Sequence, residues 1–331
     1  MIAVDANGAD AGPEAVAEGA RRSGERVLLF GPADRLGPSE GNVEVVDAPE
    51  RIGGDEEPVR AVRGRPEASI VQAAAAVADG RADALVSAGA TGPTLAAATL
   101  AVKRIKGVHR PAIAALLPLP AGRVLLLDAG ANVEVRPEHL VQFAYMGVAF
   151  MEHVEGVDRP RVGLLSVGAE AGKGTPDIRA AHERLAAGEL AFAGNVEGFD
   201  LPSAAVDVVV TDGFTGNVAL KTMEATSKVT REAIRGAIRS SAVATVGGLL
   251  IRGAVDGLRA RLDPEAVGGA ILLGLRRPVV IGHGSFGPVG LASAIGLARR
   301  AVDERMVERT AAALAAGGAL RSAAAGSVSR E

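Results

Sequence analysis

Residues Val4–Gly12 read VDANGADAG, a run of small residues and glycines that follows directly on the apolar segment Ile2–Val4. A short apolar run followed by a glycine-rich turn recurs at Ser87–Gly92, Asp128–Val133, Gly168–Gly174, Asp212–Asn217 and Gly282–Gly287. Glycine lets backbone N–H groups approach a ligand closely, and where a helix follows, its first N–H groups favour an anion. Several such turns in one chain predict an anion-binding cleft formed by many loops at the carboxyl ends of the strands.

Short apolar runs alternate with longer segments of helical periodicity over almost the whole chain. The predicted strands are Ile2–Val4, Val27–Phe30, Val43–Val46, Ala84–Val86, Ala112–Leu116, Val124–Leu127, Val162–Val167, Leu190–Ala193, Val206–Thr211 and Val279–Ile281. The predicted helices are Pro13–Ser23, Ala68–Asp79, Gly92–Ile105, Pro137–Val154, Thr175–Leu185, Val218–Ser240 and Gly287–Ala315. This alternation implies right-handed crossovers and a mostly parallel sheet covered on both faces, a Rossmann-like three-layer α/β/α fold.

We expect residues 1–315 to form a single α/β domain, because no Pro/Ser-rich linker divides them. Residues 218–262 form a long helical stretch, interrupted near Gly247–Gly248, and are predicted to be a helical hairpin or projection. The apolar residues that recur there at near-helical spacing are Val243, Val246, Leu249, Leu250, Leu258 and Leu262, and the charged ones are Arg252, Arg259 and Arg261. Such a stripe is more typical of a dimer interface or core packing than of membrane contact, although one segment can serve both. Residues 316–331 are rich in Ala, Gly, Ser and Arg and are predicted to be a disordered tail.

Composition excludes several classes of protein. The net charge is −3 and aromatic residues make up 2% of the chain, so neither a positive field nor stacking platforms for a dedicated nucleic-acid binder are present. The chain has no cysteine, which excludes disulfides, thiolate metal sites and an acyl-cysteine intermediate. No apolar run approaches the roughly 20 residues that span a bilayer. We therefore expect a cytoplasmic protein, for which peripheral membrane contact remains open.

Polar side chains in the glycine-rich turns are candidates for holding phosphate or an oxyanion. Lys173 lies between Gly172 and Gly174, where its ammonium could reach into a cleft, and a solvated loop charge is the alternative. Asn132 and Asn217 follow glycine-containing turns and offer amide donors, although asparagine in such places also bonds nearby backbone. Lys221 follows Asn217 by one helical turn, so that both side chains could face the same cleft, unless Lys221 is only a surface residue.

The remaining candidates have mixed interpretations. His283 in Gly282–Ser285 could donate to a carbonyl group or protonate a leaving thiolate, although a lone histidine is usually structural. Ser87 and Thr91 precede a helix and at least one of them is expected to cap it, which is compatible with phosphate binding. Asp128 and Asp212 are expected to fix loop geometry, His139 to be structural, and Asp10 to cap the helix entered at Pro13. Further residues placed at the phosphate or substrate site are Asp5, Gly8, Gly89, Gly92, Gly130, Gly216 and Ser285.

A series of short blocks, in order from Met1 to about Ala301, resembles the signature blocks of bacterial phosphate acyltransferase. The blocks are Asp5–Asp10, Glu57–Arg63, Ser87–Gly92, Arg104–Gly107, Asp128–Val133, Arg136–Leu140, Gly172–Gly174, Gly194–Glu197, Asp212–Asn217 and His283–Ser285. That family is the acyl-(acyl-carrier-protein):phosphate acyltransferase of phospholipid synthesis. The resemblance implies attack of inorganic phosphate on the thioester of a long-chain acyl-carrier protein, which gives acyl phosphate. It also implies a fold akin to phosphotransacetylases and isopropylmalate-type dehydrogenases, a homodimer, loose association with the inner face of the membrane, and no metal or organic cofactor.

On this interpretation Lys173, Asn132 and Asn217 hold phosphate and the oxyanion, and His283 assists. The chain departs from the family at Ala90, where an Asn is usual. Two alternatives stay open: a phosphotransacetylase that uses a short acyl-CoA, and an inactive homologue that scaffolds lipid synthesis. An isopropylmalate-type dehydrogenase is disfavoured, because its chemistry needs a carboxylate cluster for a divalent metal ion.

Overall fold

The computed structural model describes residues 1–320. One eleven-stranded sheet runs through the chain in the order β3-β2-β1-β4-β11-β10-β5-β6-β9-β7-β8. The strands are β1 Ile2–Asp5, β2 Val27–Gly31, β3 Val43–Asp47, β4 Ala84–Ser87, β5 Ala112–Leu119, β6 Gly122–Leu127, β7 Val162–Leu165, β8 Phe192–Val196, β9 Val208–Val210, β10 Ala270–Leu273 and β11 Val279–Ile281. The helices are α1 Gly12–Ser23, α2 Ala33–Leu36, α3 Pro58–Gly64, α4 Ser69–Ala78, α5 Thr91–Ala101, α6 Pro137–His153, α7 Pro176–Ala186, α8 Gly213–Ile238, α9 Ala242–Arg261, α10 Pro264–Val267, α11 Pro288–Asp303 and α12 Met306–Ala316.

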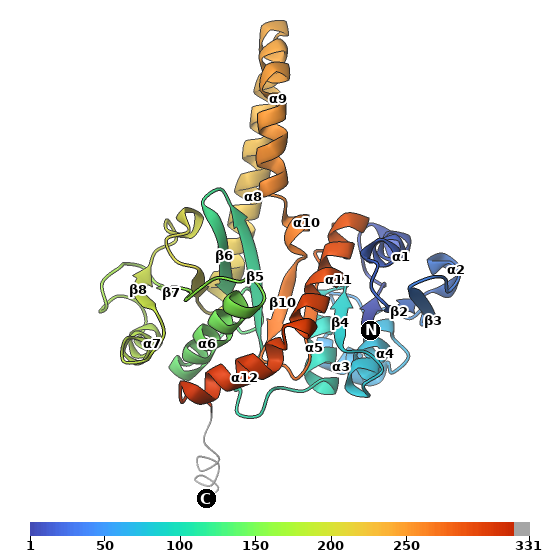
Figure 1. Ribbon diagram of the computed structural model, residues 1–331, viewed down its shortest axis with the longest axis horizontal. Helices are drawn as coiled ribbons and strands as arrows, with labels where there is room; N and C mark the ends of the chain where they lie inside the picture. The colour runs from blue at the N-terminus through green and yellow to red at the C-terminus, as the bar shows by residue number, and fades with distance from the viewer. Residues whose placement is uncertain (321–331) are drawn as a thin grey trace, which may run out of the picture.

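Helices cover both faces of this sheet (Figure 1). Side chains alternate between the faces along each strand. In β1, Ile2 and Val4 therefore pack in the core formed with α1, α6, α7, α11 and α12, whereas Ala3 packs in the core formed with α3, α4 and α5. The first turns of α8 cover the second face over β6 and β9, through Ala219, Leu220 and Met223. The predicted three-layer α/β/α fold is confirmed.

The two halves of the sheet run in opposite directions. All neighbouring strands are parallel except for the pairs β11–β10, β10–β5 and β5–β6. Across these three antiparallel pairs, β6, β9, β7 and β8 come to run opposite to β1, β2, β3, β4 and β11. The glycine-rich turns therefore divide between two edges of the sheet. This corrects the expectation that all of them follow strands ending at one common edge.

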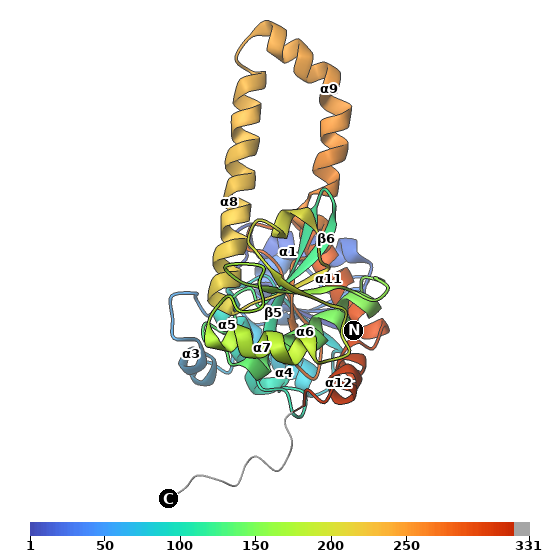
Figure 2. The ribbon, with the colours of Figure 1, turned by 90° about the vertical axis from the view of Figure 1, so that its left-hand side faces the viewer.

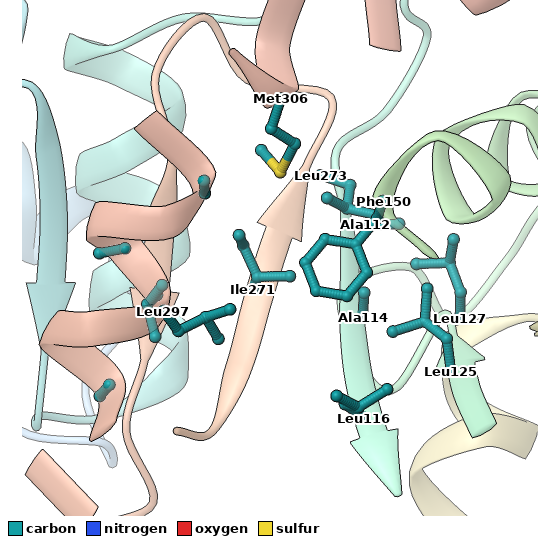
Figure 3. Close-up of a cluster of buried hydrophobic side chains, with 14 of the residues drawn as sticks. Ala112, Ala114, Leu116, Leu125, Leu127, Phe150, Ile271, Leu273, Leu297 and Met306 are labelled. Atoms are coloured by element: carbon teal, nitrogen blue, oxygen red, sulfur yellow. The ribbon is translucent and has the colours of Figure 1, made fainter. Parts of the chain in front are cut away.

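The sequence did not predict the central strand β10. Figure 3 shows its side chains Ile271 and Leu273 in the core near Leu297 of α11 and Phe150 of α6. Gly269 precedes β10 with φ +94°, and a Cβ there would overlap the carbonyl oxygen of Ile281, so only glycine fits. A short apolar run bounded by glycines does not by its periodicity distinguish a strand from buried helix, which explains the omission.

Helices α8 and α9 extend away from the body of the molecule (Figure 2), as predicted for a helical projection. The break between them falls at residues 239–241 and not at Gly247–Gly248, which lie inside α9. Ser241 caps α9 by accepting a hydrogen bond from the Ala244 backbone N at 3.1 Å. Glycine inside a helix costs only about 1 kcal/mol, so a glycine pair does not by itself end one. Within the described residues 1–320, no helix has the length and apolar character needed to cross a membrane.

The C-terminal part also differs from the prediction. The expected helix Gly287–Ala315 is two helices, α11 and α12, separated by a turn in which Arg305 has φ +50°. After α12 the chain packs back on the body, because Gln142 Nε2 donates a hydrogen bond to the Ala319 carbonyl oxygen at 2.8 Å. The rest of the predicted tail, residues 321–331, lies outside the described residues.

Candidate active site

A buried hydrogen-bond cluster forms where β1 and β4 end. Asp5 is 2% exposed and accepts hydrogen bonds from Ser69 Oγ at 2.6 Å, Ser87 Oγ at 2.8 Å and the Asn7 backbone N at 3.2 Å. Burial raises the pKa of Asp5 to about 6, and these hydrogen bonds oppose the increase. Asp5 and Ser87 were expected to bind phosphate. The structure corrects this, because both side chains are buried and bonded to each other and therefore hold the turn together.

Glycines allow the first two turns at this edge to meet. Gly8 has φ +98°, and a Cβ there would lie 3.0 Å from the Gly89 Cα. A Cβ at Gly89 would lie 2.8 Å from the Asn7 carbonyl oxygen, and one at Gly92 would lie 3.0 Å from Cγ of Pro58 in α3. These glycines are therefore required for packing, whether or not a ligand also approaches them.

The first turn of α5 has no side-chain cap. Its N-cap residue is Ala90, and neither Ser87 nor Thr91 caps the helix, which corrects the sequence expectation. The Ser87 hydroxyl instead accepts hydrogen bonds from the Gly89 backbone N at 3.1 Å and Thr94 Oγ1 at 3.0 Å. Thr91 remains exposed. Asp10 likewise does not cap α1, whose N-cap residue is Ala11.

The third turn at this edge contains His283 and leads into α11. His283 and Ser285 are both exposed, and their Nδ1 and Oγ atoms lie 2.7 Å apart. The carboxylate of Glu265 accepts hydrogen bonds from the backbone N atoms of Gly287 and Gly290, each at 3.1 Å. Because this carboxylate already occupies the start of the helix, a second anion is disfavoured there. The sequence reasoning did not single out Glu265.

At the opposite edge, Asp128 organises the turn after β6, residues 128–133, which we call the Asp128 loop. Asp128 is fully buried and accepts hydrogen bonds from the backbone N atoms of Ile113 (3.0 Å), Gly130 (3.1 Å), Ala131 (3.0 Å) and Asn132 (2.7 Å). Burial raises the pKa of Asp128, and these hydrogen bonds oppose the rise. The predicted role of Asp128 in fixing loop geometry is confirmed.

Asn132 belongs to the same network. Its Nδ2 donates one hydrogen bond to the Pro111 carbonyl oxygen and one to Oδ2 of Asp128, each at 2.8 Å. An amide nitrogen has two hydrogens to donate, so both donors are used. The structure thus corrects the expectation that the Asn132 amide is free to donate to a ligand, and places this residue in a positioning role.

The turn from β9 into α8 packs directly on the Asp128 loop. A Cβ at Gly216 would overlap the Asp128 carbonyl oxygen, and one at Gly213 would lie 2.7 Å from backbone atoms of Asn132. Asp212 caps α8 by accepting hydrogen bonds from the backbone N and Oγ1 of Thr215 at 2.8 and 2.7 Å, as predicted for a geometric role. The absence of side chains at the two glycines is what brings the start of α8 against the loop.

This packing places Asn217 beside the Asp128 loop. Its side chain lies 3.7 Å from the position of a Cβ at Gly130, which has φ +140°. Asn217 is half-buried, and its amide has no hydrogen-bond partner within residues 1–320. Lys221, one turn further along α8, is exposed and also without a partner there. Asn217 therefore has free donors on a rigidly held helix start.

The turn after β7, residues 168–174, carries Lys173, and we call it the Lys173 loop. Its backbone is held by Asn195 of β8, which is 7% exposed and whose Nδ2 donates to the Glu170 carbonyl oxygen at 2.8 Å and to that of Gly168 at 3.4 Å. The Oδ1 atom of Asn195 lies 2.9 Å from Nδ1 of His182. Lys173 itself is exposed and forms no ion pair with any of residues 1–320.

The glycines on either side of Lys173 differ in their surroundings. Gly174 has φ +95°, and a Cβ there would lie 2.7 Å from the Ile178 side chain, whereas Gly172 faces open space. Asn195 was not among the predicted site residues. The only sequence signal for it was its place in the Gly194–Glu197 block.

The structure brings some predicted residues together and separates others. Asn217 lies against Gly130, Gly216 packs on Asp128, and Asn132 packs on Gly213. The Lys173 loop follows a strand that ends at the same edge of the sheet. His283 and the Asp5 cluster lie where strands of the opposite direction end. His139 is buried and accepts a hydrogen bond from the Arg136 backbone N at 3.2 Å, which confirms its structural role. Over residues 1–320, no three His, Asp or Glu side chains are grouped so as to hold a metal ion.

Two solved structures with the same fold are named as a phosphotransacetylase and a phosphotransacylase. The structure resembles a phosphotransacetylase from Streptococcus pyogenes, with a TM-score of 0.58, 18% sequence identity, and coverage of 93% of this chain and 94% of that one. It also resembles a branched-chain phosphotransacylase from Enterococcus faecalis V583, with a TM-score of 0.57, 17% sequence identity, and coverage of 91% of this chain and 99% of that one. At such low identity the likeness shows the fold alone, which is the phosphotransacetylase-like fold predicted from the sequence.

Sequence comparison identifies the family. The model of a family described as "Fatty acid synthesis protein" matches residues 1–309. The phosphate acyltransferase of Anaeromyxobacter sp. (strain Fw109-5) is 44% identical over 340 residues, which cover 99% of this chain and 95% of that protein. The phosphate acyltransferase of Lactococcus lactis subsp. lactis (strain IL1403) is 42% identical over 305 residues, which cover 89% of this chain and 92% of that protein. The chain belongs to the phosphate acyltransferase family and is an acyltransferase, which confirms the resemblance of the sequence blocks.

Proposed function

We propose that the protein transfers a long-chain acyl group from acyl-carrier protein to inorganic phosphate, forming acyl phosphate for phospholipid synthesis. The observation that carries this proposal is the unpartnered amide of Asn217, held against the Asp128 loop in a chain 44% identical to a phosphate acyltransferase. The unpaired ammonium of Lys173 at the same edge of the sheet supports it. Hydrogen-bond donors and cations without protein partners favour a ligand that is an anion.

In this reaction a phosphate oxygen attacks the thioester carbonyl carbon, and a new C–O bond forms. The carbonyl oxygen becomes an oxyanion, which collapses as the C–S bond breaks and the electron pair leaves with the sulfur. Phosphate is already a nucleophile near neutral pH, so the protein mainly has to hold it against the carbonyl group and stabilise the oxyanion. The leaving thiolate takes up one proton.

Each proposed residue has a role that fits its surroundings. Lys173 and Asn217 contact phosphate or the oxyanion, and Lys221 adds positive charge one turn along α8. Asn132 acts through the Asp128 loop and not by direct contact, since both its donors are used. His283 follows β11, whose carboxyl end lies at the other edge of the sheet from Lys173 and Asn217, so it is not given the expected role of proton donor to the thiolate.

The helical projection supports two proposed partners, a second copy of the chain and a membrane surface. Helix α9 buries none of its side chains, and α8 buries only Gly213 and Gly216. Figure 2 shows the two helices standing apart, and exposed apolar side chains include Val243 (84%) and Leu250 (83%). We propose that a second copy covers part of these apolar faces and that the end of the projection contacts the inner face of the membrane peripherally. An isolated apolar face of this size is otherwise costly in water.

The test is phosphate-dependent release of free carrier protein from palmitoyl-acyl-carrier protein, with acyl phosphate trapped by hydroxylamine and acetyl-CoA assayed in parallel. Turnover of the long-chain donor alone is the expected result. Turnover of acetyl-CoA would instead favour a phosphotransacetylase, which the fold also accommodates. A folded protein that turns over neither donor would refute the enzymatic proposal and leave a scaffold of lipid synthesis.

Lys173→Ala tests the site itself. Because the Lys173 ammonium has no partner within residues 1–320, its removal should leave the folded state intact and lower turnover by about 100-fold, the scale of one lost oxyanion donor. An unchanged rate in the folded variant would remove Lys173 from the mechanism.

A further inference from the structure

Two loops form a joined surface at the edge of the sheet where β5 begins. One connects α5 to β5 and the other connects β10 to β11. The Ile105 backbone N donates to the Gly274 carbonyl oxygen at 2.9 Å, and the Arg276 backbone N donates to that of Lys103 at 3.0 Å. The opposite end of β5 lies under the projection, where Arg261 Nη2 of α9 donates to the Pro120 carbonyl oxygen at 3.2 Å. The joined loops therefore lie at the end of the body away from the projection, as Figure 1 shows for the loop before β5.

These loops carry positive charges that no carboxylate within residues 1–320 neutralises. No Asp or Glu occurs in the sequence between Asp83 and Asp128. The exposed cations, which together we call the basic platform, are Lys103, Arg104, Lys106, Arg110, Arg276 and Arg277. None of them forms an ion pair with any of residues 1–320. In a chain with a net charge of −3, such a cluster concentrates positive potential on one surface.

Two of the six charges, those of Arg104 and Arg276, are held in place by backbone carbonyl groups. The Arg104 guanidinium donates to the carbonyl oxygens of Val108 and His109, and Arg276 Nε donates to that of Arg104 at 3.0 Å. A pocket of about 450 Å³ opens between the loops, and none of the described residues that line it carries a carboxylate. The Glu138 carboxylate, whose charge interacts with His109, forms a salt bridge with Arg184, in which Oε2 of Glu138 and Nη1 of Arg184 lie 3.6 Å apart. The platform therefore has no counter-ion among residues 1–320, and two of its guanidinium groups are fixed by backbone oxygens.

The basic platform is continuous with the candidate active site. Arg110 directly precedes Pro111, whose carbonyl oxygen accepts the Asn132 amide at 2.8 Å. Two residues further on, the Ile113 backbone N donates to Asp128 at 3.0 Å. The platform is thus joined through one short segment to the Asp128 loop, against which Asn217 packs.

We propose that the basic platform is the docking surface for the acyl donor, and that it binds an acidic face of the carrier protein. The proposal rests on the proposed function, since it names where that donor binds. Arg110 and Arg277 lie outside the pocket lining, so the cations extend over more surface than a single phosphate group can cover. Spread charges of this kind complement a protein face, where they set the association rate and orientation. Docking there leaves the projection at the opposite end of the molecule, formed by the outer part of α8 and by α9, free for the membrane.

The test is charge reversal of two exposed lysines that take no part in the proposed chemistry, Lys103→Glu with Lys106→Glu. The matched control is Arg231→Glu with Arg235→Glu on the projecting part of α8, which makes the same change in net charge with two exposed residues that form no ion pair within residues 1–320. Binding of fluorescently labelled holo-carrier protein is measured by anisotropy at low and moderate salt. The KM and kcat for palmitoyl-carrier protein and the KM for phosphate are measured alongside.

We expect the lysine variant to raise the Kd and the KM for the carrier at least tenfold, with kcat and the KM for phosphate within twofold of wild type. Wild-type binding should weaken with salt, and the control should bind as wild type does. An unchanged Kd, or an equal loss in the control, overturns the docking proposal even if turnover is normal. A rise in the KM for phosphate instead would make the platform a small-anion site and also overturn it. If the wild type turns over acetyl-CoA but neither binds nor uses the carrier, the proposed function itself fails.

Discussion

Replacing Asn195 by Ala should reduce activity through Lys173, which Asn195 does not touch. The substitution removes the amide donor to the carbonyl oxygens of Glu170 (2.8 Å) and Gly168 (3.4 Å), and both bonds hold the Lys173 loop to β8. Each such bond contributes about 1 kcal/mol net, so the loop loses about 2 kcal/mol of anchoring. Since 1.4 kcal/mol is a factor of ten, kcat should fall by up to about 30-fold.

The assay is steady-state turnover of palmitoyl-carrier protein with phosphate, together with urea denaturation of each variant. Asn42→Ala is the matched control, because Asn42 Nδ2 likewise bridges two carbonyl oxygens, those of Ala20 (3.1 Å) and Glu25 (2.6 Å), in the other half of the sheet. Both variants should lose a similar amount of stability. Only Asn195→Ala should lose turnover.

The double variant Asn195→Ala/Lys173→Ala separates positioning from any direct role. If Asn195 acts only by holding the Lys173 loop, the double variant has the same kcat as Lys173→Ala, because there is no ammonium left to position. Losses that multiply would show that Asn195 acts independently of Lys173. Wild-type kcat in a destabilised Asn195→Ala would reduce its role to packing.

Three further predictions follow from particular contacts. Folded Asp5 keeps its proton up to about pH 6, whereas in the unfolded chain its pKa has the ordinary value of 3.8. The free energy of unfolding is therefore greatest below pH 3.8 and falls as the pH rises from 3.8 to about 6. Between these two pH values the free energy of unfolding of the wild type should fall by about 3 kcal/mol relative to that of Asp5→Asn. Urea denaturation at several pH values measures this, and the same dependence on pH in both proteins would contradict it. Gly216→Ala should cost about 2–3 kcal/mol and most activity, because its Cβ overlaps the Asp128 carbonyl oxygen. Gly236→Ala, in the open part of α8, should instead gain up to about 1 kcal/mol, and thermal denaturation compares the two. Leu249→Ser with Leu250→Ser should weaken flotation with anionic vesicles at least tenfold, since each Leu buried in the membrane contributes about 2 kcal/mol. The oligomeric species seen in sedimentation should not change. Unaltered flotation would argue against membrane contact at this end of the molecule.

Local sequence patterns predicted most of the elements and the turns that carry the candidate site. Apolar runs followed by glycines located β1, β4, β6, β7, β9 and β11 and the loops after them. The geometric roles of Asp128 and Asp212 could also be inferred locally, because an Asp bonds backbone N–H groups within a few residues of itself. Where the partner is close in sequence, the chemistry of the residue and its neighbours is sufficient.

Long-range pairing decided what local patterns could not. Parallel and antiparallel strands have the same apolar periodicity, so the sequence did not indicate that β5–β6 and β10 reverse half of the sheet and divide the turns between two edges. The same limit applies to single side chains. Asn132 and Asn217 have similar surroundings in the sequence. However, the Asn132 amide donates a hydrogen bond to the carbonyl oxygen of Pro111, 21 residues away, whereas the Asn217 amide has no hydrogen-bond partner within residues 1–320.

The sequence by itself thus determined the α/β layers, the glycine-rich turns and the family, because periodicity and turn chemistry act over a few residues. Only the tertiary structure decided which polar groups are satisfied and which remain for a ligand. Glu265 occupies the start of α11 and Asn195 holds the Lys173 loop through contacts between segments separated by 22 to 27 residues. Hydrogen bonds between such segments form only once the chain has packed, so no local pattern contains them.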